Sequence, residues 1–350
     1  MSLISVSDFI PLQQSISNMH AEAPQRTVSE KLYLTDDGLR FDDSILWLDS
    51  KKSGNLSFLS SAHSVRERYS SQVIVSQETQ ELLKLYNPDI KSLVCQYNRP
   101  FSIGRYNLEL LQAGSVLGGS SLYIETNAEK FLYAPMLSRS NSLLAKFFHS
   151  KKVDYLILKV DHCENNRHLL LRKKEEEDRF LQAIETCLEE GRIPVVVTPL
   201  LHTASALCFL LSSSGVKILA HKHVYDVNKV YESFGQKVGE FKQLNLRKIE
   251  ERAALVVPPS FRLKQLLQIE KKHQFFFIND RLNSSYDYGS HDIFHIPLPQ
   301  ASLDIVKTIK EFKPKKTFLF GPYAKKFSSI HKSLGLDLEV LNPFQQNALL

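Results

Sequence analysis

The pattern of apolar residues changes once along the chain, near Arg172, and this change constrains the fold more than any other feature. Before Arg172, short β-like runs such as KLYL, SILWLD, SSLYIE and DYLILK are separated by turn residues. After it, segments with helical spacing alternate with short apolar strands such as Pro194–Val197. A strand-rich first part followed by this alternation predicts a mixed α/β protein whose later part contains a parallel sheet covered by helices.

The helices of the later part have clear bounds in the sequence. The segment KKEEEDRFLQAIETCLEEG begins with charged residues, places apolar residues from Phe180 to Leu188 at helical spacing and ends at Gly191. The run Phe275–Phe277 is expected to be a buried strand, not a platform for stacking bases. Further helices are expected over residues 203–212, 224–234, 261–269, 302–312 and 324–334, with strands at VKILA, ALVV, QFFFI and DIFHI.

Composition narrows the class of protein. The chain has 350 residues, enough for two domains, and 44 basic against 38 acidic residues give a formal charge of +6. This mild excess is compatible with a polyanionic partner but is far from a basic nucleic-acid tail. No secretory leader or membrane-spanning apolar stretch is visible, so no membrane partner is expected. Four scattered cysteines predict a reduced, cytoplasmic protein without disulfides or a thiolate zinc site: Cys95, Cys163, Cys187 and Cys208.

Several motifs of the first part follow one another in a recognisable order. A strand over residues 55–60 ends in Ser61-Ala62-His63-Ser64-Val65-Arg66, which resembles S-H-x-H-x-D-H, the metal-binding loop of the metallo-β-lactamase fold. Other segments resemble the landmarks of that family in order and spacing: Leu48-Asp49, the glycine-rich turn 111–120, the strand end Phe131–Met136 and the strand Asp154–Lys159.

The later part extends the resemblance to the β-CASP nucleases. Residues 194–197, Tyr231 and 258–260 resemble the β-CASP domain, and Lys313–Gly321 resembles the closing strand that ends in H-G. The layout is most similar to the ligase-associated DNA exonucleases and is also similar to RNA 3′-end-processing exonucleases. The resemblance implies an αββα metallo-β-lactamase sandwich with an inserted β-CASP-like α/β domain. The implied division is an arm at 1–29, a core at 30–172 and 285–350, and the inserted domain at 173–284.

The positions that bind metal in the family are changed in this chain. Of the first loop only His63 matches, and it is expected to cap the loop by bonding to Ser61 or Ser115. The remaining family ligand positions carry residues that do not suit a metal site: Ser61, Val65, Arg66, Ser115, Met136, Lys159, Pro299 and Phe320. A two-metal hydrolase needs several N and O ligands around ions about 4 Å apart. The sequence therefore predicts a lost zinc site, no cofactor and a catalytically inactive relative of the family.

Basic residues in the loops around the former site suggest a second use for it. In the resembling fold these loops surround the substrate cleft, and losing acidic ligands while keeping bases would suit phosphate backbones. The residues concerned are Lys51, Lys52, Arg66, Arg68, Arg99, Arg105 and Lys159. The implied function is a pseudonuclease of DNA repair or RNA processing. It would bind nucleic acid or act as a scaffold for an active nuclease, a helicase or a DNA ligase.

Two other functions stay open from the sequence. An active nuclease with a relocated metal site would use Asp161, His162, Cys163 and Glu164, whose side chains can all ligate a metal. Similar but weaker histidine pairs occur at 221 and 223, expected on one face of a strand, and at 291 and 295. A protein–protein module that binds neither metal nor nucleic acid is the other alternative.

Overall fold

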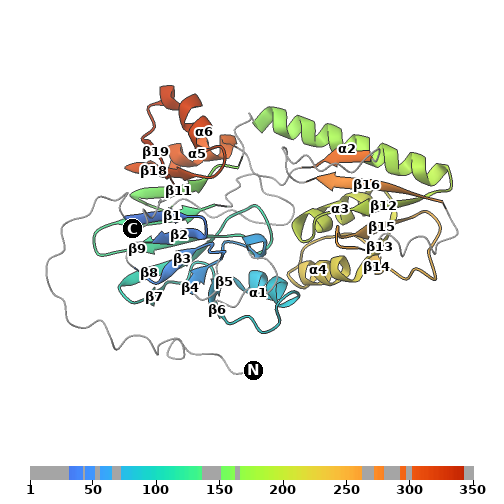
Figure 1. Cartoon of the computed structure of the whole chain (residues 1–350), viewed down its shortest axis with the longest axis horizontal. Coiled ribbons are helices and arrows are strands. Elements are labelled where there is room, and N and C mark those ends of the chain that lie inside the picture. The colour runs from blue at the N-terminus through green and yellow to red at the C-terminus, as the bar shows by residue number, and fades with distance from the viewer. Residues whose placement is uncertain are drawn as a thin grey trace, which may run out of the picture.

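The computed structural model describes residues 31–41, 44–51, 56–64, 72–135, 151–161, 166–261, 272–279, 292–296 and 302–342. Within these residues the chain is a mixed α/β protein with three β-sheets and six α-helices (Figure 1). The expected arm at 1–29 and the helix expected at 261–269 lie almost entirely outside the described residues.

The first sheet has six strands in chain order, β1 to β6. Its first three strands are antiparallel and the next three are added in parallel. Leu48 at the end of β3 pairs with Phe58 at the end of β4, so the residues that follow both strands emerge at the same edge. The strands are β1 Leu32–Thr35, β2 Gly38–Phe41, β3 Leu46–Leu48, β4 Leu56–Phe58, β5 Val73–Val75 and β6 Ser92–Val94.

The second sheet has seven strands in the order β19-β18-β11-β10-β9-β8-β7. Strands β7 to β10 are antiparallel, whereas β10, β11, β18 and β19 are parallel. The chain leaves this sheet after β11 and returns to it at β18. The strands are β7 Phe101–Ile103, β8 Tyr106–Gln112, β9 Ser120–Glu125, β10 Lys130–Ala134, β11 Tyr155–Lys159, β18 Lys316–Phe320 and β19 Leu338–Val340.

The first two sheets pack face to face through one apolar core. Phe41 of the first sheet meets Phe131 of the second edge-on, with ring centroids 5.0 Å apart, and Phe58 and Ile157 are buried in the same core. Helix α1 (Gln77–Lys84) buries Leu82 and Leu83 with the valines of β5. Helices α5 (Ser302–Phe312) and α6 (Ala324–Ile330) pack on the outer face of the second sheet. The layers are therefore helix, sheet, sheet and helix.

The third sheet lies entirely between β11 and β18 in the chain and is wholly parallel. Its central strands are buried on both faces, which explains their unbroken apolar sequences, and Phe276 is buried as expected. The predicted parallel sheet is confirmed. The elements are α2 Asn166–Glu189, β12 Ile193–Val197, α3 His202–Ser213, β13 Lys217–Ala220, α4 Lys222–Ser233, β14 Phe241–Gln243, β15 Ala253–Val257, β16 His273–Asn279 and β17 Asp292–His295.

The expectation that His221 and His223 share a face of a strand is wrong. Strand β13 ends at Ala220, and His221 is the N-cap of α4, where its ring Nδ1 accepts a hydrogen bond from the backbone N–H of His223 at 3.3 Å. The His221 ring packs edge-on against Phe261, 5.4 Å between centroids. A capping role accounts for this pair without a metal, because a helix N-terminus needs acceptors for its free N–H groups.

The third sheet contacts the first part of the molecule through a shared core. Leu59, Ala62 and Leu117 lie in one buried cluster with Leu201 and Tyr231. This contact places the loop after β4 against the start of α3, where the candidate site is found. None of the helices in the described part of the chain is both long and apolar enough to cross a bilayer.

Candidate functional site

Asp49 holds the strand ends of the first two sheets together. It follows β3 with a positive φ of 51°, a conformation that Asp tolerates better than most residues. One carboxylate oxygen accepts the backbone N–H of Ser60 at 2.8 Å, and the other accepts the hydroxyl of Tyr133 from β10 at 2.9 Å. Burial, followed by the charge of Asp49, raises the pKa of Tyr133 well above its usual value, so the phenol stays a donor.

The loop after β4 is fixed by backbone and hydroxyl contacts. A 3₁₀ turn spans Ala62–Ser64, the hydroxyls of Ser60 and Ser64 lie 3.2 Å apart, and Ser61 Oγ accepts the backbone N–H of His63 at 3.3 Å. The expected bond between His63 and Ser61 therefore exists, but the backbone makes it. Both ring nitrogens of His63 are buried and have no hydrogen-bond partner among the described residues, and this burial lowers the pKa of His63 to about 4.

A second buried histidine lies beside this loop. His202 begins α3 directly after Leu201, which has a positive φ of 67° and packs in the same cluster as Ala62. Its Nδ1 has no partner in the described residues. Burial, followed by the repulsion of a charged His63, lowers the pKa of His202 to about 3. The fold thus brings together two neutral imidazoles from segments far apart in the sequence.

Sequence reasoning missed His202. The one signal available was its place after β12, at the carboxyl end of a parallel strand and the start of a helix, where α/β proteins place functional groups. His202 matched none of the metallo-β-lactamase motifs, and His63 lies in the 3₁₀ turn after β4 of the first sheet. Only the packing of the third sheet against the first part reveals the pair.

The glycine-rich turn is held by hydroxyl groups. The carbonyl oxygen of Gly118 accepts three of them, from Ser76 at 3.1 Å, Thr79 at 2.9 Å and Ser120 at 2.9 Å. Ser115 is buried in this turn, and its Oγ would lie 3.4 Å from a Cβ added at Gly119. The backbone N–H of Ser120 donates to the carbonyl of Ser60 at 2.7 Å, which joins the turn to the His63 loop.

Lys159 and Phe320 lie side by side at the ends of paired strands β11 and β18. The Lys159 ammonium is 2.9 Å from the carboxylate of Asp161, so its charge is paired. The Phe320 ring stacks on Tyr133 with centroids 6.0 Å apart and an interplanar angle of 16°. A stacked aromatic ring and an internal ion pair therefore occupy these two strand ends, which suits a structural role.

Not all of the basic residues that were expected to surround the site lie near it. The Lys51 ammonium is exposed and 3.4 Å from the carbonyl of Asp36, in the turn between β1 and β2. Arg105 lies at the wrong edge: it precedes β8 and donates to the hydroxyl of Tyr106 at 3.0 Å, whereas the site follows the far end of that strand. Lys52, Val65, Arg66, Arg68, Met136, Pro299, His162, Cys163 and Glu164 lie outside the described residues.

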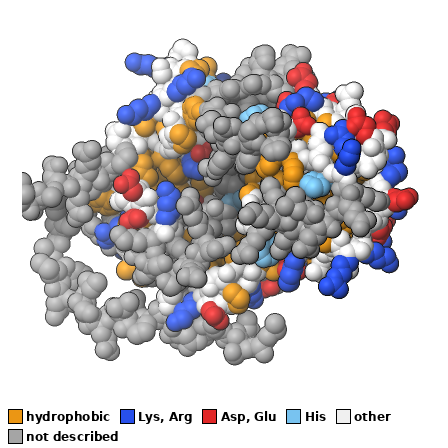
Figure 2. Space-filling view, turned by 45° about the vertical axis from the view of Figure 1, so that its right-hand side comes forward, with side chains coloured by type: hydrophobic (Ala, Val, Ile, Leu, Met, Phe, Trp, Pro, Cys, Tyr) orange, Lys and Arg blue, Asp and Glu red, His pale blue; other side chains and the backbone are white. Residues whose placement is uncertain are grey.

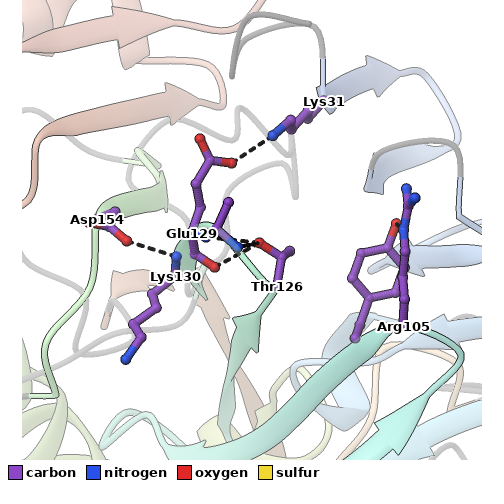
Figure 3. A network of polar contacts seen from close by, with 8 residues as sticks. Lys31, Arg105, Thr126, Glu129, Lys130 and Asp154 are labelled. Carbon is purple, nitrogen blue, oxygen red and sulfur yellow. Dashed lines mark hydrogen bonds and ion pairs between the residues drawn. The ribbon is translucent and has the colours of Figure 1, made fainter. Parts of the chain in front are cut away.

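Figure 3 shows that this opposite edge of the second sheet carries a structural polar network. The Lys31 ammonium is 2.6 Å from the carboxylate of Glu129, and Thr126 Oγ1 accepts the backbone N–H of Glu129 at 2.9 Å. Asp154 accepts the backbone N–H of Lys130 at 2.9 Å, and Lys315 pairs with the same carboxylate. These contacts fix the strand starts, and the carboxylates of Glu129 and Asp154 are both engaged by them.

The residues do not suit a metal site. No group of three or more His, Cys, Asp or Glu side chains that could hold an ion occurs among the described residues. The pair His63 and His202 supplies two imidazoles, fewer than the three or four protein ligands that zinc uses. The relocated site expected around Asp161 has only this one residue within the described part of the chain, and its carboxylate is engaged by Lys159.

Comparisons with known proteins bear on the fold alone. Neither a protein-family model nor a curated protein matches this chain. A solved structure described as a protein of unknown function from Enterococcus faecalis V583 is similar, with a TM-score of 0.53 and 12% sequence identity. The similarity covers 83% of this chain and 80% of that one. At this identity the likeness shows a shared mixed α/β fold and says nothing of activity.

Proposed function

We propose that the chain is a catalytically inactive relative of the metallo-β-lactamase and β-CASP nucleases that binds nucleic acid or holds a partner protein of DNA repair or RNA processing. The observation that carries the proposal is the set of contacts at the strand ends. There Asp49, Ser60 and Tyr133 keep the loops in place while the ligand positions carry Phe320 and the paired Lys159. The contacts that hold the loops are present, whereas these two positions carry side chains that do not bind a metal.

The layer order supports the assignment of the fold. Two sheets packed face to face between helices, with a separate α/β unit between β11 and β18, is the arrangement that the sequence resemblance implies. In the resembling family the acidic residue at the position of Asp49 precedes the metal loop, and here the Asp49 carboxylate accepts the backbone N–H of Ser60, the residue directly before that loop. The contact between Asp49 and Ser60 is therefore in keeping with the resemblance.

The chemistry of the site supports the loss of catalysis. Metal-assisted hydrolysis needs ligands that hold the ion and leave a position open for water. Ser61 and Ser115 are buried hydroxyls, His63 and His202 are neutral, and the nearby Asp161 carboxylate is matched by Lys159. Ser61 is not placed as a metal-free nucleophile beside His63 as its base, because Ser61 Oγ contacts the backbone N–H of His63 and not its ring.

The experiment is a paired assay of binding and cleavage. Purified protein is titrated into a fluorescently labelled single-stranded oligonucleotide at low and moderate salt, and the same substrate is incubated with added Mn²⁺ or Zn²⁺. We expect binding that weakens with salt, is reduced by Arg66→Glu or Lys159→Glu, and is not followed by cleavage. Turnover that disappears in His162→Ala would contradict the proposal, since it would indicate an active nuclease with a relocated metal. Absence of binding would leave the partner-holding role, tested by pull-down for a nuclease, helicase or ligase.

A further inference from the structure

Positive charge is concentrated in the last part of the described chain. Residues 302–342 contain eight lysines and four acidic residues, a net charge of +4 out of the chain's formal +6. Seven of these lysines are exposed, and six of the seven lie on or directly after α5, on α6 or at the 3₁₀ turn that follows. We call these six the C-terminal lysine surface: Lys307, Lys310, Lys313, Lys325, Lys326 and Lys332.

These lysines differ from those on the other helices. Four of the five lysines of α1, α2 and α4 pair with a carboxylate one turn away, namely Lys84 with Glu81, Lys173 with Glu177, Lys222 with Asp226 and Lys229 with Glu232, and Lys174 is the exception among the described residues. Pairs at this spacing are the ordinary way in which a solvated helix face carries lysine. The lysines of the C-terminal lysine surface make no ion pair within the described residues, whereas their neighbours Lys315 and Lys316 do.

The fold places these charges on the outward sides of helices that pack on the second sheet. The buried sides of α5 and α6, with Ile309 and Phe312 on one and Phe327 on the other, pack on the second sheet, so the lysine-bearing sides face outward. Figure 2 shows Lys and Arg side chains gathered at the upper left, the part of the molecule where Figure 1 places α5 and α6. Lys307 and Lys310 are three residues apart, a rise of about 4.5 Å along a helix, comparable with the 3.4 Å axial spacing of phosphates along one strand of DNA.

We propose that the C-terminal lysine surface binds the phosphate backbone of a nucleic acid, independently of base sequence, and that it contributes more to binding than the former metal cleft. This rests on the proposed function and names the surface that performs it. Lysine is a point charge suited to phosphate, and residues 302–342 contain no arginine to form bidentate contacts with bases. Phe312 and Phe327 are buried, so these aromatic rings are not available for stacking on bases.

Helix stabilisation and membrane binding account less well for these lysines. Cations at the end of α5 would stabilise the helix dipole, but this accounts for Lys310 and Lys313 and not for the lysines of α6. A membrane surface would also attract lysines. However, a helix that enters a membrane interface needs a free apolar side, and the apolar side of α5 is buried against the second sheet.

The test compares two variants with equal loss of charge. The first changes Lys307, Lys310, Lys325 and Lys326 to Gln. The matched control changes Lys84, Lys222, Lys229 and Lys242 to Gln, four lysines elsewhere on the molecule that each pair with a carboxylate. Both full-length proteins and the wild type are titrated by fluorescence anisotropy into labelled single-stranded and duplex oligonucleotides of unrelated sequence, at several salt concentrations, and into vesicles containing anionic lipid. Circular dichroism verifies the fold of each.

We expect the first variant to bind at least about tenfold more weakly than the wild type, and its dependence of log affinity on log salt to be shallower by roughly three units. The control should stay within about twofold, since its lysines are already neutralised by carboxylates. Equal losses in both variants would overturn the proposal, because total charge alone would then account for binding. Unchanged binding in the first variant would overturn it while the proposed function stands, whereas no binding by the wild type would overturn it together with the nucleic-acid-binding form of the proposed function and leave only the partner-holding role. If the substitutions of the first variant weaken binding to vesicles but not to oligonucleotides, the ligand of this surface would be a lipid surface and not a nucleic acid.

Discussion

Tyr133 donates its hydroxyl to the Asp49 carboxylate at 2.9 Å, across the interface between the two facing sheets. Asp49 follows β3 of the first sheet and Tyr133 lies in β10 of the second. The other oxygen of the same carboxylate accepts the backbone N–H of Ser60, the first residue of the polar loop after β4. One side chain therefore ties both sheets to the loop that carries His63.

Replacement of either partner should destabilise this junction. Asp49→Asn weakens two hydrogen bonds to a charged acceptor, and we expect a loss of about 2–3 kcal/mol in the free energy of unfolding. Tyr133→Phe removes one hydroxyl and should cost about 1–2 kcal/mol. Urea unfolding followed by circular dichroism measures both. Asp337→Asn, at an exposed position, is the control and should change stability by less than about 0.5 kcal/mol.

The sequence predicted the elements better than the contacts between them. Helix α5 begins and ends at the predicted residues, because apolar spacing and the charged positions of one helix are local features. The parallel third sheet was also predictable, since strands buried on both faces have continuous apolar runs. His221 shows the limit: a strand that ends one residue earlier turns a predicted strand pair into a helix cap.

The site was predictable in position and not in detail. The order of motifs placed Ser61, Lys159 and Phe320 near strand ends, and the structure places them there. However, the sequence did not predict the contacts between segments that are far apart in the chain. The stacking of Phe320 on Tyr133 needs the pairing of β11 with β18, and the approach of His202 to the His63 loop needs the packing of two sheets. Sequence periodicity carries no information about which faces meet.

The glycine-rich turn offers a second prediction with an internal control. Gly118 has φ of +75°, and a Cβ there would lie 2.7 Å from the backbone nitrogen of Thr79 and 2.5 Å from its Oγ1. Gly118→Ala must therefore displace the start of α1 and weaken the bonds from Ser76 and Thr79 to the Gly118 carbonyl. We expect a loss of about 3 kcal/mol or more, measured by chemical denaturation.

The control for Gly118→Ala is Gly104→Ala. Gly104 also has a positive φ, +55°, but no atom lies within 4 Å of a Cβ added there. It should therefore lose only about 1 kcal/mol, from the strain of a left-handed conformation. Equal effects of the two substitutions would show that backbone strain, and not the close approach to α1, sets the cost at Gly118.

The two buried histidines predict a loss of stability in mild acid. The pKa values of His63 and His202 are lowered to about 4 and about 3 in the folded protein, from 6.5 for a free side chain, mainly by burial. The unfolded chain therefore takes up protons below pH 6.5 while the folded chain does not. Stability is complete above pH 6.5 and falls as the pH drops toward 4, by up to about 2 kcal/mol per histidine at pH 5.

The pH prediction is tested by urea unfolding at pH 7 and pH 5. His63→Asn and His202→Asn should each flatten the difference between the two pH values, even though each substitution lowers stability at pH 7. His223→Asn, at an exposed position, is the control and should leave that difference as in the wild type. A wild-type protein that is equally stable at both pH values would contradict the burial of neutral imidazoles at this junction.

Metal analysis provides the most direct test of the proposal that this chain binds no metal. Protein purified without chelators should contain well under one zinc or manganese ion per chain by inductively coupled plasma mass spectrometry. The reason is that the described residues contain no group of three or more His, Cys, Asp or Glu side chains that could hold an ion, and two neutral ligands such as His63 and His202 hold these ions weakly. Two stoichiometric ions would contradict the proposal of an inactive relative. A single ion that disappears in both His63→Ala and His202→Ala, but not in the control His223→Ala, would instead show that the histidine pair, with further ligands, binds a metal.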